Sequence, residues 1–151
     1  LRFEPETFDL IWSEGAIDII GFKRGLHDWR PLLKPEGYLV VSHVSWLAVD
    51  IPDVPRNFWQ EACPEIATIE RNTDIIAESG YTVVDHFVLP ESAWWADYYG
   101  PIEERVPELR GKLQGSTSAL DKLETLERAI EMYRKYSSIY GYVFYISQKS
   151  T

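Results

Sequence analysis

The sequence is poor in the residues that hold metals and disulfides. It has one cysteine, Cys63, which cannot form a disulfide within the chain. No CxxC motif occurs, and the three histidines share no ligand spacing with each other, so the sequence predicts no metal site. An unpaired thiol is typical of reducing compartments, and we therefore expect a cytoplasmic protein.

Basic residues are fewer than acidic ones. Fifteen Lys and Arg residues oppose 24 Asp and Glu residues, which gives a net charge of -9. Proteins that bind nucleic acids neutralise phosphates with a basic surface, so this charge disfavours a nucleic-acid partner. No apolar run approaches the ~18 residues that cross a bilayer, so we expect no membrane partner either.

Glycine-rich loops are also missing. No GxGxG motif occurs, and Gly21 and Gly25 stand four residues apart where a helix is expected. Nucleotide-binding loops place their glycines in the turn between a strand and a helix, because the backbone must approach the ligand there. The 151 residues therefore lack a loop of this kind.

Strand and helix patterns alternate along the chain. Apolar or β-branched runs predict strands at residues 8–13, 38–42, 81–89 and 142–147. Apolar spacings of three and four predict helices at residues 16–33, near 58–62, at 73–79 and at 118–136. The first of these is expected to be irregular in its first part, because Gly21 and Gly25 interrupt it. This order predicts an α/β fold, and the aromatic and charged residues 91–140 are expected to form a helical insertion before the last strand.

Three segments resemble class I S-adenosylmethionine-dependent methyltransferases. Residues 8–16 (FDLIWSEGA) are similar to the family's fourth strand and the turn after it, and residues 32–42 (LLKPEGYLVVS) to its "L-K-P-G-G" turn and fifth strand. Residues 131–136 and 140–146 resemble the end of a group of uncharacterised bacterial and archaeal methyltransferases. Glu36 stands where the family turn has the first of two glycines.

The resemblance implies that residues 1–151 are a partial domain. They would be the second half of a Rossmann-like methyltransferase sheet, strands four to seven, with the last strand antiparallel. The cofactor-binding half, with its glycine-rich loop and ribose-binding carboxylate, is not in this sequence. The strand at residues 8–13 would then have an unpaired apolar edge, and we expect a homodimer through it.

The function implied by the resemblance is methyl transfer from S-adenosylmethionine to a small-molecule acceptor. Ser13, Glu14 and Gly15 follow the first strand, and ligands of open α/β sheets bind at such strand ends, so these residues are candidates for cofactor binding. Because the main cofactor loop is absent, we expect this chain alone to bind the cofactor weakly or not at all and to be inactive.

Other side chains are candidates for the reaction and the acceptor. His43 follows the expected strand 38–42 and has the pKa range of a general base, although a lone histidine is also common as a structural residue. Trp46, Trp94, Trp95 and Tyr98 are candidates for a substrate pocket, since aromatic rings can wall an apolar or cationic acceptor. They are equally well explained as core residues.

A different class of function remains open. The chain is also compatible with a non-catalytic α/β fragment or interaction module that assembles through its exposed edge. Binding of S-adenosylhomocysteine distinguishes the two hypotheses.

Overall fold

A computed structural model describes residues 3–150, which divide into two compact units. Of these residues, those up to Leu89 and those from Ser138 onward form unit 1. Unit 2 is Pro90–Ser137, inserted into unit 1 between its last two strands in sequence. Among the described residues, no helix has the length and apolar character needed to cross a membrane.

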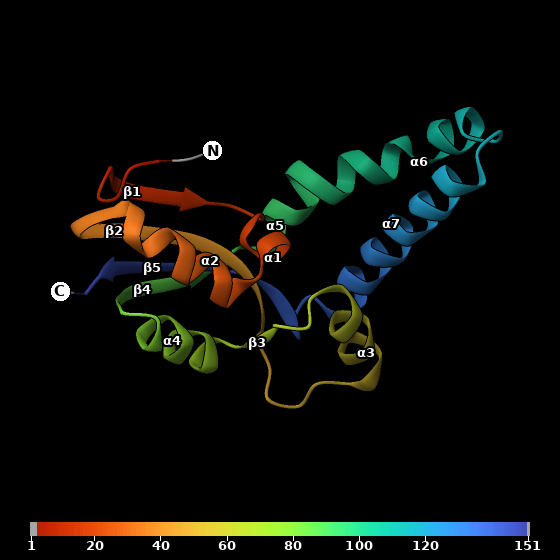
Figure 1. Ribbon diagram of the computed structural model, residues 1–151. Coiled ribbons are helices and arrows are strands. Elements are labelled where there is room, and N and C mark those ends of the chain that lie inside the picture. The colour runs from red at the N-terminus through yellow and green to blue at the C-terminus, as the bar shows by residue number, and fades with distance from the viewer. Residues whose placement is uncertain (1–2, 151) are drawn as a thin grey trace. The chain divides into compact units, whose positions relative to one another are not determined.

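Unit 1 contains a five-stranded mixed sheet (Figure 1). Its strands are β1 (Phe8–Ser13), β2 (Leu33–Trp46), β3 (Ala67–Thr68), β4 (Tyr81–Val88) and β5 (Tyr140–Lys149). The order is β1-β2-β5-β4, and the short β3 pairs with the end of β2. β1 is parallel to β2, whereas β5 is antiparallel to both of its neighbours. The α/β class and the antiparallel last strand are thereby confirmed.

The helices of unit 1 connect these strands. They are α1 (Ile17–Ile20), α2 (Phe22–Trp29), a 3-10 turn (Arg30–Leu32), α3 (Asp53–Ala62) and α4 (Ile69–Glu78). The helix predicted for residues 16–33, with an irregular first part, is divided in two: Gly25 lies within α2, whereas Gly21 has a φ of +95° and separates α1 from α2. Glycine adopts this conformation readily, whereas other residues pay a steric cost.

One face of the sheet carries the core of unit 1. Leu39 and Val41 of β2 and Tyr145 of β5 are fully buried on this face, together with Leu26 of α2 and Ile76 of α4. Burial of these apolar side chains is the main force that holds α2 and α4 on the sheet.

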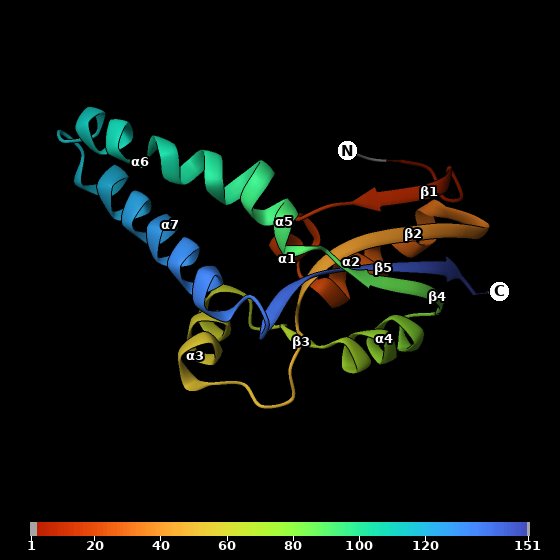
Figure 2. The same ribbon diagram turned by 180° about the vertical axis from the view of Figure 1, so that it is seen from behind.

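The opposite face is largely uncovered by unit 1. Figure 2 shows it from behind, and no helix of unit 1 lies over it within the described residues. Leu10 and Trp12 of β1 are 49% and 56% exposed, and Tyr38 and Phe87 are also exposed. β1 is therefore covered on one face only, where Phe8 and Ile11 pack against the core.

β2 is longer than its sequence pattern indicates. It begins at Leu33 and ends at Trp46, so His43 lies inside the strand and not in the loop after it. The extension is stabilised by pairing, because His43, Val44, Ser45 and Trp46 are all opposite residues of β5. The LKPEG turn keeps a local irregularity: Glu36 has a φ of +61°, and the register with β1 shifts between Phe8 and Leu10.

Unit 2 is helical. It consists of α5 (Glu91–Trp94), a π-helical turn η2 (Trp95–Tyr99), α6 (Gly100–Lys112) and α7 (Thr117–Tyr136). The Ser116 hydroxyl accepts a hydrogen bond from the Ala119 N–H and caps α7. Trp94, Tyr99 and Tyr133 are buried together, while Arg134 of α7 pairs with Glu103 of α6 at 2.6 Å.

Candidate functional site

The carboxyl end of β1 carries the predicted cofactor residues. Ser13 ends β1 opposite Val41, and Glu14 and Gly15 follow it directly. The Gly15 N–H donates to the Ser42 hydroxyl over 2.8 Å, which ties this turn to β2. Gly15 has a φ of +56°, a left-handed conformation that favours glycine.

Two features of this turn fit a polar ligand. The Ser13 hydroxyl is buried and has no hydrogen-bond partner among the described residues. A Cβ added at Gly15 would have only the Tyr142 hydroxyl oxygen nearby, at 4.0 Å, so the backbone here is open to approach. Glu14 is exposed, and its carboxylate accepts a 2.6 Å hydrogen bond from the Trp12 indole. The turn could therefore hold part of S-adenosylmethionine, although the glycine-rich loop is not in the sequence.

His43 follows Ser42 in β2 and is buried in the core of unit 1. Its ring is fully buried and stacks on Phe22, with centroids 4.1 Å apart and planes 5° from parallel. Nδ1 forms a short contact with a carboxylate oxygen of Asp18, and Nε2 has no partner among the described residues. A general base must reach the proton that it removes, so the catalytic role of His43 stays a prediction.

Cys63 lies beside this pair. It follows α3, and its N–H donates to the Trp59 carbonyl over 2.8 Å. Burial raises the pKa of its thiol to about 11, and the nearby Asp18 carboxylate adds to the increase. One ligand atom each of Asp18, His43 and Cys63 lies within 4.8 Å of the others. Sequence reasoning missed this cluster because its members come from three elements and share no motif spacing.

A buried polar network lies at the end of β2. The Asn72 amide nitrogen donates to the Ser45 hydroxyl (3.0 Å) and to the Tyr145 hydroxyl (3.1 Å), and these two hydroxyls are 2.8 Å apart. Burial raises the pKa of Tyr145. The Asn72 side-chain oxygen is buried and has no partner among the described residues, but the bonds from its nitrogen link α4 to β2 and β5. No sequence motif predicts this network.

The predicted pocket residues fall in both units. Trp46 ends β2 in unit 1, with its ring edge-on to Tyr140 at 6.5 Å. Trp94, Trp95 and Tyr98 belong to unit 2, where Trp94 stacks on Tyr133 at 4.2 Å. The structure thus links the turn of Ser13, Glu14 and Gly15 to Ser42 through the Gly15 N–H. In unit 2 it groups Trp94 and Trp95 with Tyr133, and Tyr98 contacts Trp94. A pocket that joins Trp46 to unit 2 stays a prediction.

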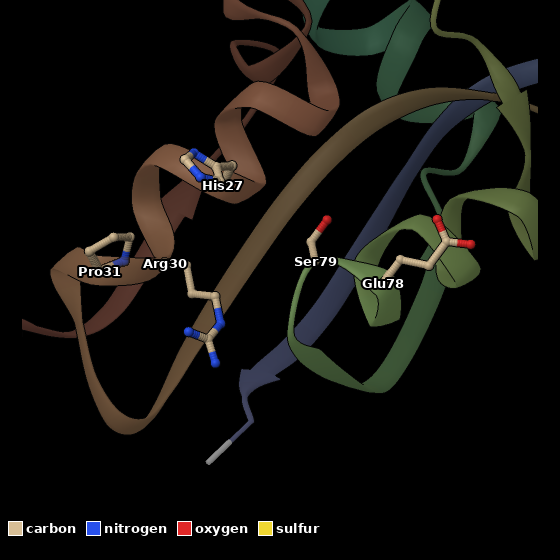
Figure 3. Close-up of a pocket in the computed structure, with 5 residues that line it drawn as sticks. All are labelled: His27, Arg30, Pro31, Glu78 and Ser79. Atoms are coloured by element: carbon tan, nitrogen blue, oxygen red, sulfur yellow. The ribbon is translucent and has the colours of Figure 1, made fainter.

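A separate cavity lies where α2 leads into β2, away from the Ser13 turn (Figure 3). It has a volume of about 370 Å³, and its lining residues are His27, Arg30, Pro31, Glu78 and Ser79. Its charged groups are already paired: Arg30 donates to the carbonyls of Gly80 (3.0 Å) and Ser150 (2.8 Å), and Glu78 binds Arg71. We interpret Arg30 as a structural tie between α2, β4 and the end of β5.

Solved structures with the same fold include several methyltransferases. The chain is similar to YjhP from E. coli (TM-score 0.77, 17% identity) over 97% of its length and 60% of that chain. It matches a SAM-dependent methyltransferase from Geobacter sulfurreducens in complex with S-adenosyl-L-homocysteine (TM-score 0.74, 16% identity) over 94% and 58%. Phosphoethanolamine N-methyltransferase 2 from Haemonchus contortus, in complex with S-adenosyl-L-methionine, matches with a TM-score of 0.71 and 17% identity, over 99% and 35%.

These similarities establish the fold. The chain spans between 35% and 60% of the length of these three structures. No family model matches the sequence, and no curated protein matches it either.

Proposed function

We propose that this chain is part of an S-adenosylmethionine-dependent methyltransferase that acts on a small-molecule acceptor. The observation that carries the proposal is the sheet: the order β1-β2-β5-β4, with β5 antiparallel to both neighbours, in a fold shared with methyltransferase structures. The same fold is also found in the [4+2]-cyclase SpnF and in the cyclopropane synthase MmaA2, so the fold alone does not fix the reaction.

The turn after β1 supplies the residues that would contact the cofactor. The Ser13 hydroxyl has no hydrogen-bond partner in the described part of the chain and can bind a polar group, and the open backbone of Gly15 lets a ligand approach closely. Glu14 places a carboxylate beside them, which is favourable near a cationic sulfonium. When bound, S-adenosylmethionine supplies the methyl group, and alignment of the acceptor is the main contribution expected of the protein.

The uncovered face of the sheet supports the view that the chain is part of a longer enzyme. Leu10, Trp12, Tyr38 and Phe87 form an exposed apolar face, and such faces mark contacts with other protein surface. A preceding half domain that carries the glycine-rich loop would cover this face and supply most of the cofactor contacts.

We expect S-adenosylhomocysteine to bind the whole gene product but not this chain alone. In isothermal titration, the longer protein should give a dissociation constant in the low micromolar range, near -8 kcal/mol, and residues 1–151 should give one at least about 100-fold weaker. In the longer protein, Gly15→Val should weaken binding at least about 10-fold, because a branched side chain opposes the left-handed backbone and fills the approach to the turn.

His27→Gln, on the exposed side of α2, is the control and should leave the affinity unchanged. Transfer of a labelled methyl group to small amine and hydroxyl acceptors then identifies the reaction. A longer protein that neither binds S-adenosylhomocysteine nor transfers the label would contradict the proposal.

The exposed apolar face of the sheet and the open edge of β1 also favour a second, non-catalytic hypothesis, in which this chain is an interaction module. Among residues 3–150, β1 pairs on one side only, with β2, and it contains neither proline nor lysine to discourage pairing on its other edge. We therefore expect residues 1–151 to form a two-fold dimer through β1. Sedimentation velocity at low micromolar concentration should give a dimer; a monomer whose β1 amides resist hydrogen exchange would show that the edge is covered within one chain.

A further inference from the structure

Three different metal-binding side chains converge in the core of unit 1. Asp18 comes from α1, His43 from β2 and Cys63 from the residue after α3. One oxygen, one nitrogen and one sulfur atom of these residues all lie within 4.8 Å of one another. An ion placed between three such atoms is at most about 2.8 Å from each, and zinc bonds are about 2.0–2.3 Å long. Because Asp18 and His43 Nδ1 are in direct contact, these two side chains would separate to admit an ion, while Cys63 would move toward it.

Two of the three ligands, His43 and Cys63, are held in place by neighbouring contacts. His43 is held in β2 opposite Val143, and its ring is packed against Phe22. The carbonyl of Cys63 accepts from the Ile66 N–H over 3.0 Å, which closes the turn after α3. In that turn, the Glu65 carboxylate accepts from the Phe22 N–H over 2.6 Å and ties the turn to the start of α2. Preorganised ligands lower the ordering cost of binding an ion.

The electrostatic balance of the cluster also favours a cation. Asp18 is largely buried, and among the ion pairs of residues 3–150 it contacts no lysine or arginine, only His43. The fully buried imidazole has a nitrogen, Nε2, without any partner in the described part of the chain. Cys63 is a buried thiol with no disulfide. A carboxylate and a thiolate would together balance a divalent charge.

We propose that Asp18, His43 and Cys63 form a binding site for a thiophilic divalent cation of the zinc class. The combination of sulfur, imidazole nitrogen and one carboxylate selects such ions over Mg²⁺ and Ca²⁺, which prefer oxygen ligands. Three protein ligands leave a fourth position for water or another donor. The site joins α1, β2 and the end of α3.

The unaltered chain provides the first test, because Cys63 is its only thiol. One equivalent of Zn²⁺ should slow the reaction of this thiol with N-ethylmaleimide at least about 10-fold, as followed by intact mass. Mg²⁺ at the same concentration should not change the rate. Co²⁺ at one equivalent should give a thiolate-to-cobalt charge-transfer band and the visible bands of a tetrahedral site.

Variants assign the ligands. Cys63→Ser should abolish the charge-transfer band, and Asp18→Asn should weaken Co²⁺ binding at least about 10-fold. His27→Gln is the matched control, since His27 also contacts an aspartate, Asp28, but in an exposed pair without a cysteine. If a variant does not fold, the protection of the Cys63 thiol in the unaltered chain still shows whether Zn²⁺ binds at this site. Equal reactivity with and without Zn²⁺, or equal Co²⁺ binding by D18N and the unaltered chain, would overturn the proposal.

Discussion

Replacement of Phe22 by alanine is expected to lower the free energy of unfolding by about 3–5 kcal/mol, the usual cost of removing a buried aromatic ring. Phe22 opens α2 and is almost completely buried. Its ring stacks on His43 and lies 6.2 Å from the Tyr145 ring, so the variant leaves a cavity between α2 and the sheet. Urea denaturation followed by circular dichroism measures the loss.

Phe87→Ala is the matched control. Phe87 lies on the uncovered face of the sheet, is 46% exposed and stacks on Phe144 at 4.9 Å. Because much of its ring is already in water, its removal should cost about half as much as removal of Phe22. Equal losses for the two variants would mean that the uncovered face is buried in solution, for example in a dimer.

Trp94→Ala is expected to have an effect of the same size in unit 2, again about 3–5 kcal/mol. Trp94 is buried and lies against Tyr133 at 4.2 Å and Tyr99 at 5.3 Å, so its ring connects α5 and η2 to α7. Loss of helical signal on denaturation, or proteolysis between α6 and α7, measures the destabilisation.

Tyr98→Ala provides the comparison, because Tyr98 stands four residues later and is 50% exposed. It should lose about 1 kcal/mol or less. A Trp94→Ala protein that keeps the parent stability would contradict the role of this ring as a core residue. If the same substitution in the longer protein kept the stability but abolished methyl transfer, Trp94 would be assigned to the substrate pocket.

Local patterns in the sequence were enough to predict most of the sheet. Residues 81–89 and 142–147 have the β-branched and aromatic composition of strands, and β4 and β5 occupy these positions. The antiparallel direction of β5 was implied by the resemblance to methyltransferases and not by the pattern itself. Periodicity carries no information on strand direction, because both directions have the same alternation.

The wrong predictions share one physical cause: tertiary contacts override local preference. The sequence of residues 16–33 predicts an irregular start to the helix, but not that Gly21, with its positive φ, divides it into two helices. β2 continues past Ser42 because β5 lies beside it, a partner about 100 residues later in the chain. An apolar run such as residues 8–13 shows that a strand is suitable for burial, but not that another layer is present to bury it.

The candidate site was predictable only where it follows a strand end. Ser13, Glu14 and Gly15 are found at the carboxyl end of β1, as expected, whereas their roles stay predictions. The Asp18, His43 and Cys63 cluster depends on how α1 and the end of α3 pack against β2. Its members are 25 and 20 residues apart, and no motif with such spacing identifies a site.

The position of β5 has a consequence for how the protein is made. β5 is the last strand in sequence, yet it lies between β2 and β4 in the sheet. While the chain is being synthesised, β2 and β4 emerge from the ribosome before the strand that joins them, and unit 2 is translated in between. Non-local pairing of this kind slows folding and leaves strand edges exposed in the meantime. We therefore expect unit 1 to need chaperone protection during translation and to complete its sheet only after β5 has been released.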